Sequence, residues 1–285
     1  MIYDTHAHSQ FSFDGERTTV EKSTKAAIEK GLGGICFTDH CDFYVPPMKA
    51  DFEPIVNEEF NVSAQQAEID RVRGLILDGE YGRAAAKKFR LLKGVEIGLY
   101  NSCRPKIKEY VASHQFDEII ASVHYLDDVD PYCGGVYYKG KNWKEAYGHY
   151  LETILKEAKW LGEGFDIIGH FDYVARYAPY PKESITYHDF ADLFDELLTF
   201  LAQNGKGLEI NTKTYKKYGL RTPELDRDIL IRFLELGGEI LTLGSDAHDT
   251  ERIGDKFDYY AQFIKSCGFR RLGHFENRKV KLVNI

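Results

Sequence analysis

Short apolar runs alternate with longer segments of helical periodicity along the chain. Seven runs rich in β-branched or apolar residues, each flanked by glycine or charge, lie at 2–5, 34–38, 90–95, 118–123, 165–169, 207–210 and 239–244. Residues 279–285 form a weaker eighth candidate. Repeated strand–helix units of this kind predict a parallel sheet covered by helices.

Three segments between these runs carry clear helix signals. Thr18 followed by Glu21 predicts a capping box at the start of a helix that ends near residue 31. Residues 185–204 and 225–236 each place apolar side chains on one face, and a glycine follows each segment. We expect these helices to form the outer ring of a barrel.

Two connections are longer than packing requires. Residues 42–60 are rich in Asp, Glu and Pro, and residues 127–142 combine aromatic side chains with glycines. Loops of such length in a compact domain are commonly functional. We expect residues 132–140 to act as a lid over a pocket.

Length and composition favour one soluble globular domain. The 285 residues suit a single barrel, so we expect one domain over residues 1–285. A net charge of −8 argues against a nucleic-acid partner or an anionic membrane surface, although a small clamped anion remains compatible. The chain carries neither an apolar run long enough to span a bilayer nor a signal peptide.

The cysteines indicate a reducing compartment. All five, at Cys36, Cys41, Cys103, Cys133 and Cys267, are far apart and form no C-x-x-C pair. We therefore expect reduced thiols in a cytoplasmic protein, and the sequence gives no indication of its oligomeric state.

The side chains that typically bind metals follow the predicted strands. His6 and His8 follow the first run, Asp39 and His40 the second, Glu96 the third, His124 the fourth, His170 the fifth, and Asp246 and His248 the seventh. Because the carboxyl ends of parallel barrel strands open on one face, these residues should converge on one pocket. We expect His114, His149, His188 and His274, on helical or loop stretches, to be surface or capping residues.

The spacing and residue types point to divalent metal ions. Residues i and i+2 of an extended segment face the same way, so His6 and His8 can reach one ion, as can Asp246 and His248. Imidazole with carboxylate suits Zn, Fe or Mn better than Ca or Mg. This set is too large for one tetrahedral ion, which predicts two or three ions.

The motifs together resemble the PHP (polymerase and histidinol phosphatase) superfamily. They are Asp4-Thr5-His6-Ala7-His8, Thr38-Asp39-His40, Gly94-Val95-Glu96, Ser122-Val123-His124, Gly169-His170-Phe171-Asp172 and Gly244-Ser245-Asp246-Ala247-His248. The chain looks most like the stand-alone histidinol-phosphate phosphatases of that superfamily, since its length fits and no polymerase is attached. The resemblance implies an α/β fold, a distorted TIM-like (β/α)7 barrel.

The resemblance also implies a trinuclear site. One ion would be held by His6, His8, Glu96 and Asp246, a second by Glu96, His124 and His170, and a third by Asp14, His40 and His248. Asp14 is the least secure of these, because relatives vary between acid and histidine there and an acidic turn residue beside glycine explains it equally well.

A cluster of this kind favours hydrolysis of a phosphate monoester. The resemblance implies that the ester is L-histidinol phosphate and that the reaction belongs to histidine biosynthesis. Asp246 or His248 could protonate the leaving group. Arg176 and Arg17 resemble phosphate-contacting arginines of the family, and we expect Glu209 and Asn211 to line the substrate side.

Three alternatives stay open. A PHP phosphoesterase could act on nucleotides or phosphotyrosine, or the chain could be a non-catalytic, metal-stabilised module. An amidohydrolase-type barrel also begins with H-x-H, but Glu96 in the bridging position disfavours it.

Overall fold

The structure is a computed structural model that describes residues 1–44, 60–133 and 135–285. Its main sheet follows the order β1-β2-β4-β5-β6-β7-β8, all parallel, and β3 pairs alongside β4. These strands are β1 (Tyr3–Ala7), β2 (Gly34–Phe37), β3 (His40–Asp42), β4 (Arg90–Gly98), β5 (Glu118–Ser122), β6 (Ile167–Ile168), β7 (Gly207–Asn211) and β8 (Leu241–Gly244). The seven predicted strands are therefore confirmed.

Backbone contacts between the first and last strands nearly close the sheet into a barrel. The amide of His8 donates to Ala247 O at 2.9 Å, and the amide of Asp246 donates to His6 O at 2.8 Å. Both bonds lie at the carboxyl ends of the strands. They bring the first and last motifs that carry metal-binding residue types, around His6 and Asp246, next to each other.

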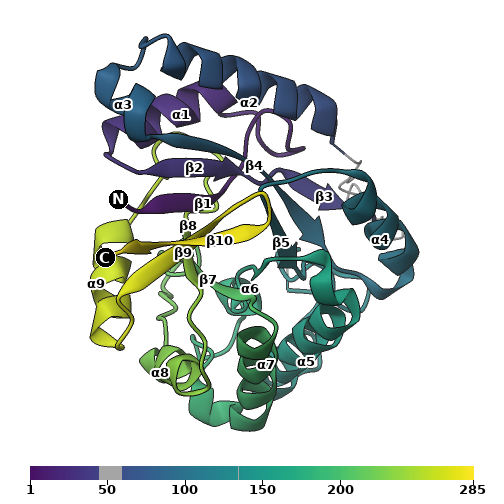
Figure 1. The fold of residues 1–285 in the computed structure, drawn as a ribbon. Helices are drawn as coiled ribbons and strands as arrows, with labels where there is room; N and C mark the ends of the chain where they lie inside the picture. Colours follow the sequence, from purple (N-terminus) through teal and green to yellow (C-terminus); the bar gives the residue numbers. More distant parts are fainter. Residues whose placement is uncertain (45–59, 134) are drawn as a thin grey trace.

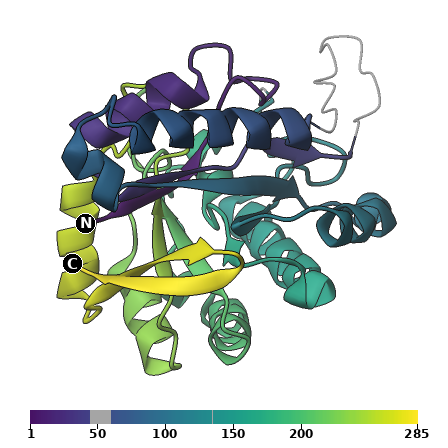
Figure 2. The same cartoon turned by 45° about the horizontal axis from the view of Figure 1, so that its top comes forward.

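Helices surround this sheet (Figures 1 and 2). They are α1 (Val20–Glu29), α2 (Val62–Leu77), α3 (Arg83–Lys88), α4 (Arg104–Ser113), α5 (Trp143–Leu161), α6 (Tyr173–Tyr177), α7 (Ala191–Gln203), α8 (Arg227–Glu235) and α9 (Phe257–Ser266). In α7 the buried face is Phe194, Leu197, Leu198 and Leu201, which matches the predicted periodicity. Among the described residues, no helix is both long and apolar enough to cross a membrane.

The start of α1 differs from the predicted capping box. Thr19, and not Thr18, is the N-cap, and its hydroxyl accepts from the amide of Lys22 at 3.2 Å. The hydroxyl of Thr18 is 2.6 Å from that of Ser23 instead. The prediction was wrong by one residue, which leaves Glu21 without a capping role.

The C-terminal segment forms a hairpin rather than an eighth barrel strand. β9 (Arg271–Glu276) pairs antiparallel with β10 (Lys279–Asn284) across a two-residue turn. Asn277 and Arg278 adopt the positive φ angles, 51° and 62°, that such tight turns use. The hairpin crosses one end of the barrel (Figure 1).

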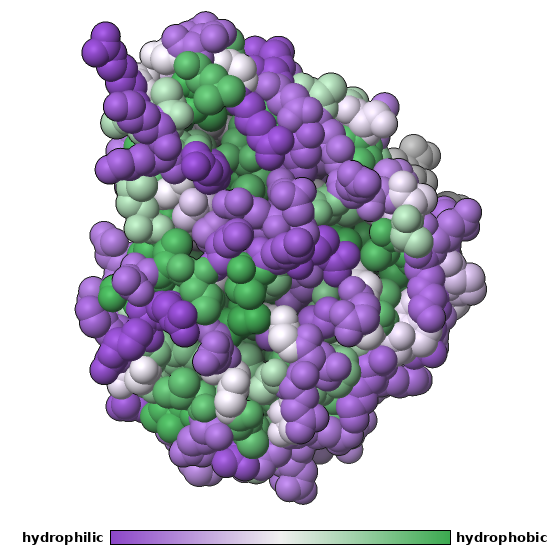
Figure 3. Space-filling model, in the orientation of Figure 1, coloured by the Kyte–Doolittle hydropathy of each residue, from purple (hydrophilic) through white to green (hydrophobic). Residues whose placement is uncertain are grey.

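This hairpin covers the mouth at the amino ends of the strands. Phe275 of β9 packs with Ile120, Ile167 and Ile240 in a buried apolar cluster. His274, expected at the surface, is instead 2% exposed and stacks on Tyr3 at 3.6 Å between ring centroids. On the face of Figure 1 the hydrophobic residues form patches separated by hydrophilic ones (Figure 3).

The two long connections differ in what the structure describes. Most of 42–60 lies outside the described residues, as does Gly134 in the predicted lid. Within 132–140, Tyr137 and Tyr138 are buried, and their hydroxyls donate to Ala146 O and Val174 O at 2.8 and 2.7 Å. Tyr132, by contrast, is 60% exposed. The two buried tyrosines anchor their part of the segment, and the lid role of 132–140 stays a prediction.

Candidate metal centre and substrate pocket

The metal-type side chains predicted from the sequence meet at the carboxyl mouth of the barrel. His6 and Glu96 lie within β1 and β4, His40 begins β3, and the others follow strands directly except Asp14, which lies in the loop before α1. Asp39 does not join this group. Its carboxylate accepts from the amide and hydroxyl of Ser9 at 2.6 and 2.7 Å and from Gln65 at 2.7 Å, so it braces the loop after β1.

Glu96 occupies the middle of the group and is fully buried. Its Oε1 lies 2.8 Å from His170 Nε2 and 3.2 Å from His124 Nε2. Its Oε2 lies 2.9 Å from His40 Nδ1 and 3.3 Å from His6 Nε2. One carboxylate thus faces imidazoles from four different strand ends, as expected of a bridging ligand.

Among the described residues, three groups of donor atoms are close enough to hold an ion. They are His6, His8 and Glu96; His40, Glu96 and His124; and His8, Asp14, His40 and His248. Asp246 Oδ1 adjoins the first group, 3.4 Å from His8 Nε2. The groups overlap the three sets that the resemblance implies, but His8 and His40 each take part in two groups.

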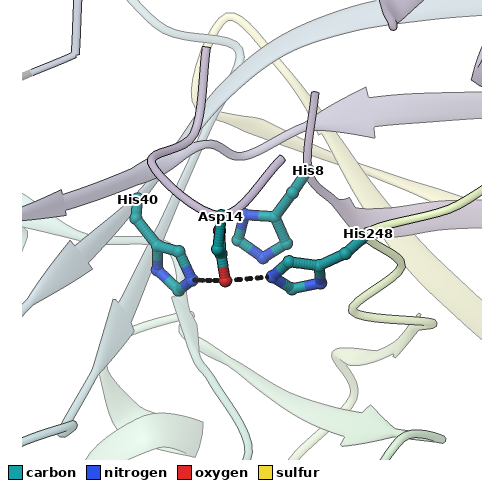
Figure 4. A group of neighbouring side chains, drawn as sticks. All are labelled: His8, Asp14, His40 and His248. Atoms are coloured by element: carbon teal, nitrogen blue, oxygen red, sulfur yellow. Dashed lines mark ion pairs between the residues drawn. The ribbon is translucent and has the colours of Figure 1, made fainter. Parts of the chain in front are cut away.

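Figure 4 shows the third group, which contains the least secure predicted ligand. Asp14 Oδ2 lies 2.7 Å from His248 Nε2 and 3.7 Å from His40 Nε2. The ring of His8 lies behind, 4.2 Å between centroids from both His40 and His248. The structure thus places the Asp14 carboxylate among imidazoles.

The outer nitrogens of several imidazoles are held by neighbouring side chains. His6 Nδ1 lies 2.7 Å from Glu209 Oε1, and His124 Nδ1 lies 3.0 Å from Asp42 Oδ1. A carboxylate that accepts from Nδ1 leaves the lone pair on Nε2, the arrangement that orients imidazole ligands in metal sites.

The Nε2 atoms then point at one another. They are 3.2 Å apart in His6 and His8, and 3.3 Å apart in His124 and His170. If Nδ1 carries the proton, two facing lone pairs repel unless a cation lies between them. Glu96 Oε2 is also buried without a hydrogen bond of good geometry among the described residues. The donor set therefore fits divalent ions.

The electrostatics keep the carboxylates ionised. Burial would raise the pKa of Glu96, but the charges of the surrounding imidazoles, His6 first, hold it well below its usual range. Burial acts likewise on Asp246, whose pKa is held well below the ordinary value by Lys213 and then His8. Both carboxylates are thus charged at neutral pH.

The pKa values of His6 and His8 shift in opposite directions. Burial lowers the pKa of His6, but Glu209 and Glu96 outweigh this and raise it well above its usual range. For His8, burial and the charge of His248 lower the pKa well below the ordinary value. Metal ions must displace a proton from His6, and they compete with none on His8.

A cavity of about 590 Å³ lies beside this group. It falls in the size range of small-molecule sites. Its walls combine metal-type residues (Asp14, His40, His124, His170, Asp246, His248) with carboxylates (Asp42, Asp130), cations (Arg176, Lys213, Lys216) and aromatic rings (Phe13, Tyr125, Tyr132, Tyr173, Tyr177, Tyr218).

Arg176 in α6 is 2% exposed at this wall. Its Nη1 lies 3.1 Å from Asp246 Oδ2, and its Nε donates to Thr214 Oγ1 at 2.8 Å. Its Nη2 is buried without a hydrogen bond among the described residues. A buried guanidinium nitrogen with no acceptor, beside a metal-type centre, suits an anionic ligand.

Three predicted substrate residues lie elsewhere. Arg17 is exposed and does not line the cavity. Glu209 and Asn211 are buried beneath the imidazoles, where Glu209 accepts from the amide of His170 at 2.7 Å and holds His6. Their oxygens and amide are engaged with the protein, so they support the centre from below rather than facing the cavity.

The sequence reasoning missed Lys213, Asp42 and Asp130. Lys213 Nζ lies 2.9 Å from Asp246 Oδ1, and Asp42 holds His124. Lys213 and Asp42 each lie two residues beyond a strand-end residue already considered, Asn211 and His40, so a period-two reading past the strand end would have found them. No such signal marks Asp130.

The chain is similar to known proteins over nearly its whole length. The family model described as the PHP domain matches residues 4–213. A histidinol-phosphatase of Lactococcus lactis is 35% identical over 277 residues, covering 97% of this chain and 95% of that protein. A probable histidinol-phosphatase of Clostridium acetobutylicum is 31% identical over 281 residues, covering 99% of both. Among solved structures, histidinol phosphate phosphatase from Lactococcus lactis, complexed with zinc, L-histidinol and phosphate, superposes with a TM-score of 0.83 at 33% identity and 98% coverage of both chains.

Proposed function

Because this chain belongs to the PHP domain family, we propose that it is a metal-dependent phosphomonoester hydrolase that converts L-histidinol phosphate and water to L-histidinol and phosphate. The observation that carries the proposal is the guanidinium of Arg176, whose Nη2 has no hydrogen bond among the described residues, at the wall shared with the metal-type centre. The Lactococcus lactis relative, with zinc, L-histidinol and phosphate bound, supports the same reading.

We assign the metal ligands to the nine residues of the predicted set. They are His6, His8, Asp14, His40, Glu96, His124, His170, Asp246 and His248, which offer room for two or three divalent ions such as Zn, Fe or Mn. When bound, such ions activate water and neutralise charge on the phosphoryl oxygens.

The chain's own residues bind and orient the phosphate. Arg176 can offer Nη2 to a phosphate oxygen while Asp246 and Thr214 fix its plane. Lys213 adds a second cation at the same wall. Two fixed cations beside the metal-type centre favour a dianionic group and hold it in one orientation.

Proton transfer to the leaving oxygen is assigned to His248 together with Asp246, whose ionised carboxylate accepts from Lys213 and orients the group rather than donating a proton itself. Asp246 Oδ1 and His248 Nδ1 lie 3.6 Å apart, and Lys213 Nζ is 2.9 and 3.2 Å from them. The three form a hydrogen-bonded group at the cavity wall through which a proton can move.

We propose one catalytic domain over residues 1–285 and a cytoplasmic location. All five cysteines are present as thiols, as a reducing compartment requires. The net charge of −8 supports a small-molecule substrate rather than a nucleic acid.

The test is phosphate release by the purified, metal-quantified protein. The substrates are L-histidinol phosphate, a nucleoside monophosphate and phosphotyrosine, with and without a chelator. We expect the highest kcat/KM on L-histidinol phosphate and loss of activity with the chelator. Higher kcat/KM on the nucleotide or phosphotyrosine would reassign the substrate. Tight metal binding without turnover would favour a non-catalytic module and refute the proposal.

A further inference from the structure

The cavity has a second charged feature on the side of the β5 loop. Asp130, between β5 and α5, lines the cavity and is 9% exposed. The cations Arg176, Lys213 and Lys216 come from the segments after β6 and β7. One wall of the cavity is thus cationic, and a carboxylate lies on another.

Asp130 is held in place but has no cationic partner. Its Oδ1 accepts from the amide of Tyr132 at 2.8 Å and from the hydroxyl of Tyr173 at 2.8 Å. No Lys, Arg or His forms an ion pair with it among the described residues, whereas Glu209 faces His6 and Asp42 faces His124.

An ionised carboxylate that is largely removed from water costs free energy unless an opposite charge meets it. Within the described part of the protein no cationic side chain is in ion-pair contact with Asp130, and the charge of His124, which is paired with Asp42 and Glu96, acts on it only from farther away. A cation that enters the cavity with the substrate would pair with this carboxylate, and a neutral or anionic group would leave it unpaired. Asp130 therefore discriminates between leaving groups by charge.

Tyr173 sets the spacing between the two charged features. Its hydroxyl donates to Asp130, while the guanidinium of Arg176 lies over its ring, 5.1 Å from the centroid. The anion-binding and cation-binding groups are thus one tyrosine ring apart. This spacing suits a short molecule that carries phosphate and amine on neighbouring carbons.

We propose that Asp130 binds the ammonium group of the leaving alcohol and makes the enzyme selective for phosphate esters of short amino alcohols. The inference rests on the proposed function and deepens it. The neighbouring rings of Tyr132 and Tyr177, 5.3 Å apart at their centroids, offer an apolar surface to the remainder of the leaving group.

The test compares L-histidinol phosphate with its deamino analogue, in which hydrogen replaces the amino group. The variant is Asp130→Asn, because the amide oxygen can still accept from Tyr132 and Tyr173 while the charge is lost. We expect the wild-type protein to prefer the aminated ester about tenfold or more in kcat/KM. In Asp130→Asn, kcat/KM should fall about 10- to 100-fold for the aminated ester and less than about twofold for the deamino ester.

Asp127→Asn is the matched control, since Asp127 lies in the same loop, is 54% exposed and does not line the cavity. Its kcat/KM should stay within about twofold of wild type on both esters. Equal losses on both esters in Asp130→Asn would show a structural role, and no loss on either, or no wild-type preference for the amine, would also overturn the inference. Failure of the wild-type protein to hydrolyse either ester would instead refute the proposed function.

Discussion

Glu96 and Glu118 are the same residue type in adjacent strands, both fully buried, at opposite mouths of one barrel. Glu96 pairs with five imidazoles, and the charges of His6, His40 and His124 hold its pKa well below the ordinary value despite burial. The carboxyl of Glu118 lies by the backbone amide of Phe275 instead, and burial, then the charge of Asp166, raises its pKa well above that value. Burial alone therefore does not decide the charge of an acid; the neighbours at each mouth do.

The two mouths of the barrel also differ in the residues that line them. The carboxyl mouth gathers imidazoles and carboxylates around a cavity, while the amino mouth is closed by the β9–β10 hairpin over Phe275 and three isoleucines. Barrel enzymes usually divide labour in this way, with chemistry at the carboxyl ends and stability at the amino ends.

The largest effect is expected from Glu96→Gln. The amide removes the negative charge that faces five imidazoles, so bound metal should fall and kcat/KM should drop about 10³-fold or more, about 4 kcal/mol. Metal analysis and phosphate release measure both quantities. The control is Glu118→Gln, a buried Glu at the other mouth, which should keep metal content and kcat/KM near wild type; equal losses in both variants would contradict the division of roles.

Phe275→Ala should act on stability rather than on chemistry. Removing a buried ring from the amino mouth should lower the free energy of unfolding by about 3–5 kcal/mol. The kcat of the folded, metal-loaded variant should remain close to wild type. Chemical denaturation gives the first value, and a large fall in kcat at unchanged metal content would show that the two mouths are coupled.

Arg176→Ala should raise KM or lower kcat so that kcat/KM falls about 100-fold, because a charge-assisted contact to phosphate is lost. Metal content should stay intact. Arg17→Ala is the matched control, and because Arg17 is exposed and outside the cavity it should change kcat/KM less than about twofold. Comparable losses in the two variants would return Arg17 to the phosphate site.

Glu118→Gln should also show a pH-dependent gain in stability. The folded protein keeps the Glu118 proton to higher pH than the unfolded chain does, so wild-type stability is lost as pH rises above the ordinary Glu pKa. The loss stops once pH passes the folded pKa. The variant lacks this penalty, so its advantage should grow from pH 5 upwards by at most about 1.4 kcal/mol per pH unit. Denaturation curves at pH 5, 6.5 and 8 test this, and a constant difference would contradict it.

The sequence predicted the strands and the centre because both depend on local patterns. The apolar runs marked seven strands, and the barrel geometry then implied that residues as distant as His6 and His248 converge. The strand β10 lies within the weaker eighth candidate at 279–285, but β9 was missed because it carries charge at both ends and has no partner until β10 folds back on it.

The surroundings of residues such as Asp130 and Glu209 depend on tertiary contacts and could not be predicted from the sequence. Asp130 matters because its loop folds back so that Tyr173 reaches it, and Glu209 is buried because His6 and His170 lie above it. The position of Glu209 in the run at 207–210 indicated that it lies near the pocket, but not which side chains would cover it. Such roles depend on which loops meet.

Anomalous diffraction from crystals of the metal-loaded protein, recorded at the absorption edges of the bound metals, tests the central claim most directly. We expect two or three peaks within coordination distance of the three donor groups described above, with at least one peak beside both Glu96 and His6. Peaks confined to other parts of the protein, or none in protein that retains phosphatase activity, would contradict it.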